Sequence, residues 1–141
     1  MRTLARILCA IDLEKASERA FERALSLAVI SEAQLHLLHA TPANVPFARR
    51  ASERLQYLAE LRERAEAAGV SVQVDEQHGD PAHVIELHAN GKKIDLVVLG
   101  SKGRSGLARR PPRSVVRRVL HGSHASVLIA RAPSASSSEN V

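Results

Sequence analysis

The sequence predicts an α/β fold, a doubly wound sheet of five parallel strands covered by helices on both faces. Short apolar runs of the kind that form buried strands alternate with segments of helical periodicity, in the order β-α-β-α-β-α-β-α-β. Strands that alternate with helices are joined by right-handed crossovers, and such crossovers make the sheet parallel. The 141 residues, 45% hydrophobic and 25% charged, suit one globular domain, which we expect to span residues 1–131.

The chain opens with a strand, a helix and a second strand. Residues 4–11 are short and mostly apolar, which predicts a strand buried on both faces and ended by Asp12. Alanine, leucine and phenylalanine recur at helical spacing over 14–30, so we expect a helix whose apolar stripe packs on the sheet. Residues 35–39 predict the second strand.

A loop, a long helix and a third strand follow. Two prolines within residues 41–46 interrupt both the helical and the strand periodicity, which predicts a loop. Residues 47–68 are rich in alanine, leucine, glutamate and arginine and predict a helix that Gly69 closes. Valine alternates with polar residues over 70–75, as in a strand.

The charges of the helix predicted over 47–68 indicate a solvated face laced with salt bridges. Glu60 and Arg64 stand at helical spacing and are expected to pair. Arginines alternate with glutamates along this segment: Arg49, Arg50, Arg54, Arg62 and Arg64 with Glu53, Glu60, Glu63 and Glu66.

A third helix begins at a clear start signal. Asp80 is suited to the N-cap, and Pro81 to the first helical position. The helix is expected to run to about Ala89, where Asn90-Gly91 closes it.

The last part of the chain contains two further strands, a glycine- and arginine-rich loop, and a short helix. Strands are predicted at 94–99 and 126–130, with the loop over 100–110 and a helix that opens at Pro112. Residues 132–141 are polar and serine-rich and are expected to form a disordered tail.

The positive charge is concentrated in one segment. The net charge is +5, but residues 1–99 carry 12 basic and 14 acidic side chains, whereas residues 100–131 carry 8 basic and no acidic ones. Such a local excess is expected either to bind an anionic partner or to form a solvated basic face.

Ligands of open parallel sheets bind beyond the carboxyl ends of the strands, where the strand order switches. That rule selects residues 10–12, 39–41 and the segment that starts at Leu99. In this last segment Gly100, Gly103 and Gly106 lie between a strand and a helix start, where backbone N–H groups can approach a phosphate. The alternative is a surface loop in which the glycines only turn the chain. The Walker motif and the dinucleotide-binding fingerprint are both absent.

Several function classes are disfavoured. A lone cysteine, Cys9, excludes a disulfide framework and is expected to be an inert core residue. His36 and His39 are three apart on a strand and face opposite sides, so we expect no metal site. The serines Ser101, Ser105 and Ser114 have no identifiable His/Asp set, and we expect no catalytic residues. Only 2% aromatic residues argue against nucleic-acid binding. The apolar runs are too short for a membrane span, and residues 1–10 lack the apolar stretch of a secretory signal, so we expect a cytoplasmic protein.

Taken together, several segments resemble the universal stress protein family. The resemblance covers residues 3–130, and its motifs occur in order: ILCAID at 7–12, LHLLHA at 35–40, GDPA at 79–82, IDLVVLGSKGRSGLAR at 94–109, SVVRRVL at 114–120 and SVLIA at 126–130. It implies a Rossmann-like fold similar to that of the adenine nucleotide alpha hydrolases, and a homodimer paired through the strand at 126–130.

The resemblance also implies a nucleotide site. Residues at the first strand end would lie beside the adenosine, Ala40 would contact adenine through its backbone, and the glycine loop and the following helix start would hold the ribose and phosphates. The implied nucleotide-binding residues are Ala10, Ile11, Asp12, Ala40, Leu99, Gly100, Lys102, Gly103, Arg113, Ser114 and Val115. Asp12 is a candidate for ribose or Mg²⁺ contact, for a helix N-cap, or for both.

One position departs from the family's ATP-binding motif G-x2-G-x9-G-[ST]. Gly100 and Gly103 match, but Arg113 stands where the third glycine is expected. An arginine there either crowds the phosphates out or pairs with them bidentately. Pro111-Pro112 stiffens the approach and removes two N–H donors.

The sequence therefore predicts a stress-response or signalling module that binds ATP or a related adenine nucleotide, with or without Mg²⁺. Any catalysis is expected to be slow ATP hydrolysis at most, because the basic loop contains no acidic residue to act as a base. Two alternatives stay open: a dimeric interaction protein of the same fold that binds no nucleotide, and a basic-patch binder of anions or nucleic acid.

Overall fold

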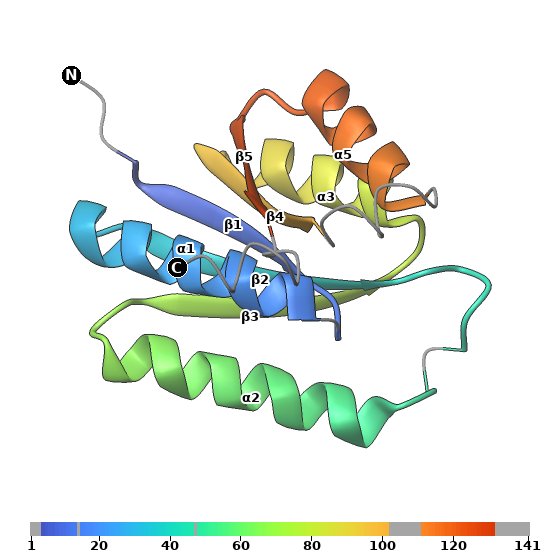
Figure 1. Ribbon diagram of the computed structural model, residues 1–141, viewed down its shortest axis with the longest axis horizontal. Helices are drawn as coiled ribbons and strands as arrows, with labels where there is room; N and C mark the ends of the chain where they lie inside the picture. Colours follow the sequence, from blue (N-terminus) through green and yellow to red (C-terminus); the bar gives the residue numbers. More distant parts are fainter. Residues whose placement is uncertain (1–3, 14, 47, 102–110, 132–141) are drawn as a thin grey trace, which may run out of the picture.

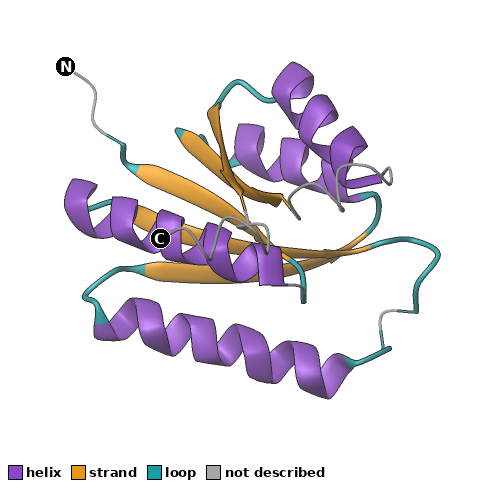
Figure 2. Cartoon of the chain, viewed as in Figure 1, coloured by secondary structure: helices purple, strands orange, loops and turns teal. Residues whose placement is uncertain are grey.

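The computed structural model describes residues 4–13, 15–46, 48–101 and 111–131. Strands and helices alternate along this part of the chain (Figure 2). The elements in order are β1 (Arg6–Ile11), α1 (Lys15–Ser31), β2 (Gln34–Thr41), α2 (Ala51–Ala67), β3 (Val72–His78), α3 (Pro81–Gly91), β4 (Leu96–Ser101), α5 (Pro111–Gly122) and β5 (Ser126–Arg131). Within the described ranges, no helix has the length and apolar run needed to cross a bilayer.

The five strands form one parallel sheet in the order β3-β2-β1-β4-β5, which confirms the predicted fold class. The chain winds outward from β1 to β3, then crosses back to place β4 on the other side of β1. Cys9 at the centre of the sheet lies opposite Leu37 on one side and Val98 on the other. The strand order therefore switches between β1 and β4, where such folds bind their ligands.

The helices cover both faces of the sheet (Figure 1). On one face, Phe21 of α1 and Leu61 of α2 share a buried cluster with Leu37 of β2. On the other face, Ile85 of α3 and Val119 of α5 pack with the central strands. Because the centre of the sheet is buried on both faces, β1 and β4 are mostly apolar runs, the pattern from which they were predicted. The edge strand β3 is less buried and was predicted from the alternation of valine with polar residues.

The second helix begins later than predicted, at Ala51 instead of residue 47, which lies outside the described part of the chain. Arg50 adopts a left-handed conformation, with φ of 55°, and such a residue cannot continue a helix. At the other end Gly69, with φ of +79°, closes the helix as predicted, and the Val70 N–H donates to the Ala65 carbonyl oxygen at 3.0 Å.

The third helix starts as predicted but ends later. The Asp80 carboxylate accepts a hydrogen bond from the His83 N–H at 3.1 Å, so Asp80 is the N-cap. The helix continues through Gly91, and it is Lys93, with φ of 54°, that turns the chain.

The strand limits also differ, most clearly where β1 meets β4. Asp95 accepts hydrogen bonds from the N–H groups of Ala5 and Arg6 at 2.8 and 3.0 Å. A side chain therefore satisfies the backbone at the start of β1, and β1 and β4 each begin two residues later than expected. In contrast, β2 and β3 extend beyond the predicted ranges to Thr41 and His78.

The solvated arginine face predicted for α2 is partly wrong. Arg54 is buried, with 4% of its surface exposed, because it pairs with Glu76 of β3. Arg64 binds Glu18 of α1 at 2.6 Å instead of pairing with Glu60 on its own helix. The Tyr57 hydroxyl also donates to Glu18, at 2.9 Å, so these charges join two helices.

Candidate functional site

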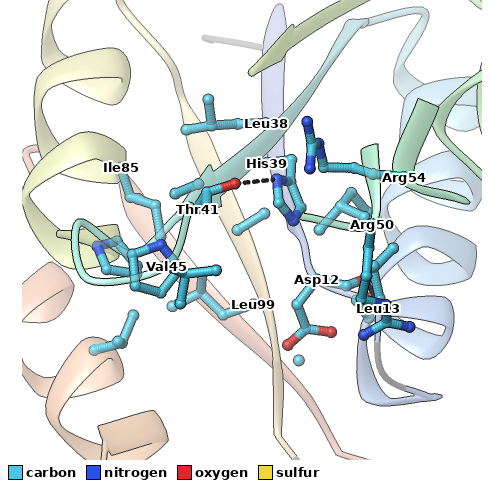
Figure 3. Close-up of a pocket in the computed structure, with 18 of the residues that line it drawn as sticks. Asp12, Leu13, Leu38, His39, Thr41, Val45, Arg50, Arg54, Ile85 and Leu99 are labelled. Atoms are coloured by element: carbon cyan, nitrogen blue, oxygen red, sulfur yellow. Dashed lines mark hydrogen bonds between the residues drawn. The ribbon is translucent and has the colours of Figure 1, made fainter. Parts of the chain in front are cut away.

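The carboxyl ends of β1, β2 and β4 open into a cavity of about 650 Å³. Its base is made by the ends of these three strands, including Ile11, Ala40 and Leu99. The helices α3 and α5 supply one wall through apolar residues such as Ile85 and Val115. The start of α2 supplies the facing wall through three arginines: Arg49, Arg50 and Arg54. Figure 3 labels lining residues from the end of β1, from β2, β4 and α3, and from the start of α2 around the cavity.

Most of the residues predicted from the sequence meet in this cavity. Those that line it are Ala10, Ile11, Asp12, Ala40, Leu99, Gly100 and Val115. Lys102 and Gly103 lie outside the described residues. Arg113 and Ser114 belong to the first turn of α5, and their side chains lie outside the described part of the chain. That these residues bind a nucleotide stays a prediction.

Asp12 follows β1 directly and is exposed at the cavity. Its carbonyl oxygen accepts a hydrogen bond from the Ser17 hydroxyl of α1 at 2.6 Å, which ties the strand end to the helix. The carboxylate points into the cavity (Figure 3), where it can accept hydrogen bonds from a ligand hydroxyl.

His39 is a cavity residue in one of the strand ends that the sequence selected, although it was not among the implied nucleotide-binding residues. It is buried on β2, and its Nδ1 lies 3.5 Å from the Thr41 hydroxyl (Figure 3). Burial is the main cause that lowers the pKa of His39, and the nearby Arg54 guanidinium lowers it further. Glu76 and Asp12 act in the opposite direction but do not reverse the shift. The imidazole is therefore neutral at pH 7 and offers an uncharged polar surface.

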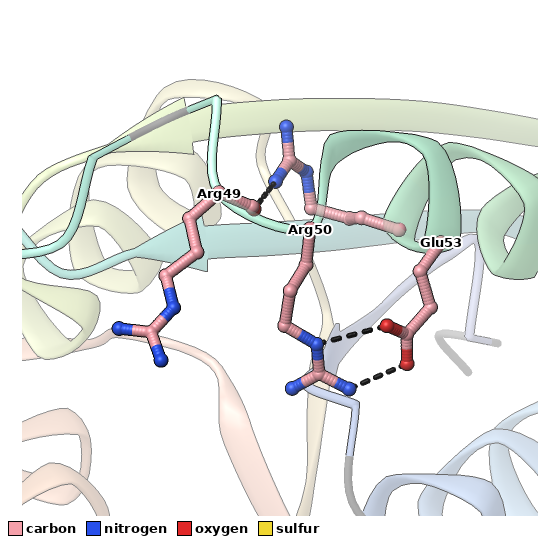
Figure 4. Close-up of polar contacts among 4 residues, drawn as sticks. Arg49, Arg50 and Glu53 are labelled. Atoms are coloured by element: carbon pink, nitrogen blue, oxygen red, sulfur yellow. Dashed lines mark hydrogen bonds and ion pairs between the residues drawn. The ribbon is translucent and has the colours of Figure 1, made fainter.

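The arginine wall was also missed, because helical periodicity alone assigned these side chains to solvent. Arg54 donates from Nη1 to the Arg49 carbonyl oxygen at 3.1 Å, which fixes the turn before α2 (Figure 4). Arg50 makes two hydrogen bonds to the Glu53 carboxylate, one to each oxygen: Nε donates to Oε2 at 2.9 Å, and Nη2 donates to Oε1. Hydrogen bonding to Arg50 lowers the pKa of Glu53. The one available signal was the grouping of three arginines directly after a predicted strand-end loop.

The histidines and the cysteine lie apart from one another. His36 faces away from His39, and its ring lies edge-on to His88 of α3 with centroids 5.7 Å apart. In the parts of the chain that the structure describes, no group of three or more His, Cys, Asp or Glu side chains is placed to hold a metal. Cys9 is fully buried, and burial raises the pKa of its thiol, so it lacks the thiolate that reactivity requires.

Comparison with known proteins places this geometry in context. A family model described as the universal stress protein family matches residues 3–131. Universal stress protein YxiE of Bacillus subtilis is 31% identical over 145 residues, which cover 89% of this chain and 98% of that protein. Universal stress protein MJ0531 of Methanocaldococcus jannaschii is 36% identical over 81 residues, which cover 57% of this chain and 48% of that protein. The matched region thus spans about half the length of this second relative.

Solved structures also match this chain. A universal stress protein in complex with cAMP is 28% identical with a TM-score of 0.73, covering 92% of this chain and 98% of that one. Hypothetical protein MJ0577 is 20% identical with a TM-score of 0.83, covering 95% and 100%. A universal stress family protein of Arabidopsis thaliana with AMP bound is 17% identical with a TM-score of 0.70, covering 92% and 93%. At these lower identities the last two likenesses concern the fold alone.

The family model covers nearly the whole chain, a curated relative matches along almost its full length, and the parallel sheet has the same fold as the solved structures. The chain belongs to the universal stress protein family.

Proposed function

We propose that this chain binds an adenine nucleotide, ATP or a relative of it, in the cavity at the switch between β1 and β4. The main support for the proposal is that implied nucleotide-binding residues from four separate segments of the chain line one cavity of about 650 Å³. That volume lies within the range of roughly 300–1,000 Å³ typical of small-molecule sites. The cAMP complex of a family member at 28% identity supports this ligand class.

Different parts of the cavity lining suit the base, the ribose and the phosphates of a nucleotide. Ile11, Ile85 and Leu99 offer apolar surface against which a base can pack. The Asp12 carboxylate is an acceptor for ribose hydroxyls, and Ala40 brings its backbone groups to the cavity. The start of α5, with Val115 at the lining, points the positive end of a helix dipole at the site for phosphates. Oxygen ligands for Mg²⁺ would come from Asp12 and the phosphates.

We further propose that the protein acts as a cytoplasmic homodimer in stress response or signalling, in which the bound nucleotide alters the choice of protein partner. In the described sheet β5 is an edge strand with β4 as its neighbour, so its other side can pair with a second copy. Val127, Leu128 and Ile129 of β5 are only half-buried in the single chain, and a dimer would cover them further.

A second candidate is an interaction protein of the same fold that binds no nucleotide. The observation in its favour is Arg113 in place of the third motif glycine, directly after Pro111-Pro112. A Cβ and a long side chain at that point would occupy space that a phosphate needs.

Calorimetric titration of the full chain with ATP, ADP, AMP, cAMP and adenosine tests nucleotide binding. We expect about one nucleotide per chain, and about tenfold weaker binding by Asp12→Asn, because a charged acceptor is lost. Glu22→Gln removes an exposed carboxylate of α1 outside the cavity and is expected to leave binding unchanged. If neither the native chain nor Arg113→Gly binds any of these ligands, the second candidate is favoured and the nucleotide site is wrong.

Sedimentation equilibrium tests the dimer separately. We expect a mass of two chains, each 15.3 kDa, at micromolar concentration. A single-chain mass over the whole concentration range would contradict the proposed pairing of β5.

A further inference from the structure

We propose that Arg49 binds a phosphate group of the nucleotide, so that the cavity contacts its anionic ligand from the α2 wall as well as from the start of α5. This inference rests on the proposed nucleotide site and assigns to it a specificity-determining residue. It predicts that the α2 wall distinguishes nucleotides from nucleosides.

The backbone of Arg49 is held firmly at the cavity. Its N–H donates to the Pro46 carbonyl oxygen at 3.0 Å, and its own carbonyl oxygen accepts from Arg54 Nη1 at 3.1 Å. Arg54 is buried and paired with Glu76 of β3, so the turn that carries Arg49 is anchored to the sheet. A fixed backbone leaves only the side chain to be ordered when a ligand binds, which lowers the entropic cost of contact.

The three arginines of the wall differ in their partners. Arg50 pairs with Glu53, and Arg54 pairs with Glu76. Within the described residues, the guanidinium of Arg49 has no hydrogen bond or ion pair. It is exposed and lies on the side of Arg50 opposite Glu53, pointing away from α2 (Figure 4). Arg49 is thus the wall residue whose donors are available to a ligand.

The chemistry of the wall favours phosphate. A guanidinium presents two parallel N–H donors that match a phosphate or carboxylate bidentately. The start of a helix carries a partial positive charge, which repels positive side chains placed there. An anion held between Arg49 and the first turn of α2 would reduce this repulsion. Among the described residues that line the cavity, the charged ones are these three arginines and one carboxylate, that of Asp12. An adenine nucleotide carries its negative charge on phosphate.

The test compares AMP with adenosine, which differ by one phosphate group. Arg49→Ala is expected to weaken AMP binding about tenfold or more, which corresponds to about 1.4 kcal/mol, and to change adenosine binding less than twofold. Arg49→Lys should recover part of the loss, because it keeps the charge but not the bidentate geometry. Arg62→Ala is the matched control: it removes the same charge from an exposed position on α2, the helix that follows the Arg49 turn, away from the cavity.

The outcomes separate this inference from the proposed function. Equal weakening of AMP and adenosine by Arg49→Ala, or no weakening of either, overturns the phosphate role while the nucleotide site stands. Failure of the native chain to bind either ligand overturns both. A titration with pyrophosphate completes the test: if its binding depends on Arg49 while AMP binding does not, the wall holds a free phosphate and the assignment to the nucleotide is wrong.

Discussion

Arg54 near the start of α2 is buried and forms an ion pair with Glu76 of β3, a residue 22 positions later in the chain. The same guanidinium holds the Arg49 carbonyl oxygen, so one buried cation joins the edge strand, the long helix and the cavity wall. His39 lies opposite Glu76 in the strand register, and the Arg54 charge contributes to lowering its pKa. The polar side of the candidate site is therefore organised around this pair.

Loss of Glu76 is expected to destabilise the protein more than loss of Arg54. Glu76→Ala leaves a buried guanidinium without its counter-ion, at a cost of about 3 kcal/mol. Arg54→Met keeps most of the packing and leaves a carboxylate that is partly exposed, at a cost of about 2 kcal/mol or less. Urea denaturation measures both values, and Glu53→Ala, in an exposed pair, is the control that should cost clearly less than either. The reverse order of the first two variants would show that Arg54 does not need its partner.

The protein should be more stable with Arg50→Gly than with Arg50→Ala. Both variants lose the exposed ion pair with Glu53, so their difference isolates the backbone at φ of 55°. A side chain in this left-handed conformation costs about 1 kcal/mol relative to glycine. We therefore expect Arg50→Gly to exceed Arg50→Ala by about 1 kcal/mol in the free energy of unfolding, measured in urea. Equal stabilities would mean that this turn is not strained.

Asp80 is expected to act mainly as a helix cap and only weakly as an ion-pair partner. Its carboxylate accepts from the His83 N–H and lies 2.8 Å from Arg118 of α5, with both side chains half exposed. Asp80→Ala should cost about 1 kcal/mol, because the cap is lost. Asp80→Asn keeps a capping oxygen, and Arg118→Ala removes only the exposed pair, so each should cost about 0.5 kcal/mol or less. Thermal or urea unfolding of the three variants checks this order, and a large effect of Arg118→Ala would contradict it.

Stability should fall as the pH drops below about 6.5, the ordinary histidine value. Burial lowers the pKa of His36, His39 and His88. Below pH 6.5 the unfolded chain therefore binds more protons than the folded one, which favours unfolding. Asp75 opposes the shift at His36 and His88, whereas Lys92 adds to it, as does Arg6 at His36.

Urea denaturation at pH 7.5 and 5.5 measures this dependence. His36→Leu fills the buried position with an apolar side chain that does not titrate, and it should show a smaller loss of stability between the two pH values than the native chain. His121→Gln, which removes an exposed histidine, is the matched control. The same pH dependence in His36→Leu as in the native chain would mean that His36 is protonated equally in both states.

Much of the fold could be predicted because its signals are local. Apolar runs marked most of the strands, and valine alternating with polar residues marked β3. Asp80 marked a helix start, and Gly69 marked a helix end. The rule that ligands bind beyond parallel strand ends selected Asp12 and Gly100, which do line the cavity. Each of these inferences needed only the chain neighbours of a residue or the alternation of strands and helices.

The burial of Arg54 in the cavity wall could not be predicted, because it depends on a partner far away in the sequence. Periodicity puts Arg54 among the solvated charges of a helix, but Glu76 draws it into the interior. Arg64 likewise reaches Glu18, which is 46 positions earlier, instead of Glu60 one turn away. By itself the sequence determined the strands, the helices and the edge of the sheet that carries the site. Only the tertiary structure decided which charges face the cavity, because burial and pairing of a charge depend on what packing brings beside it.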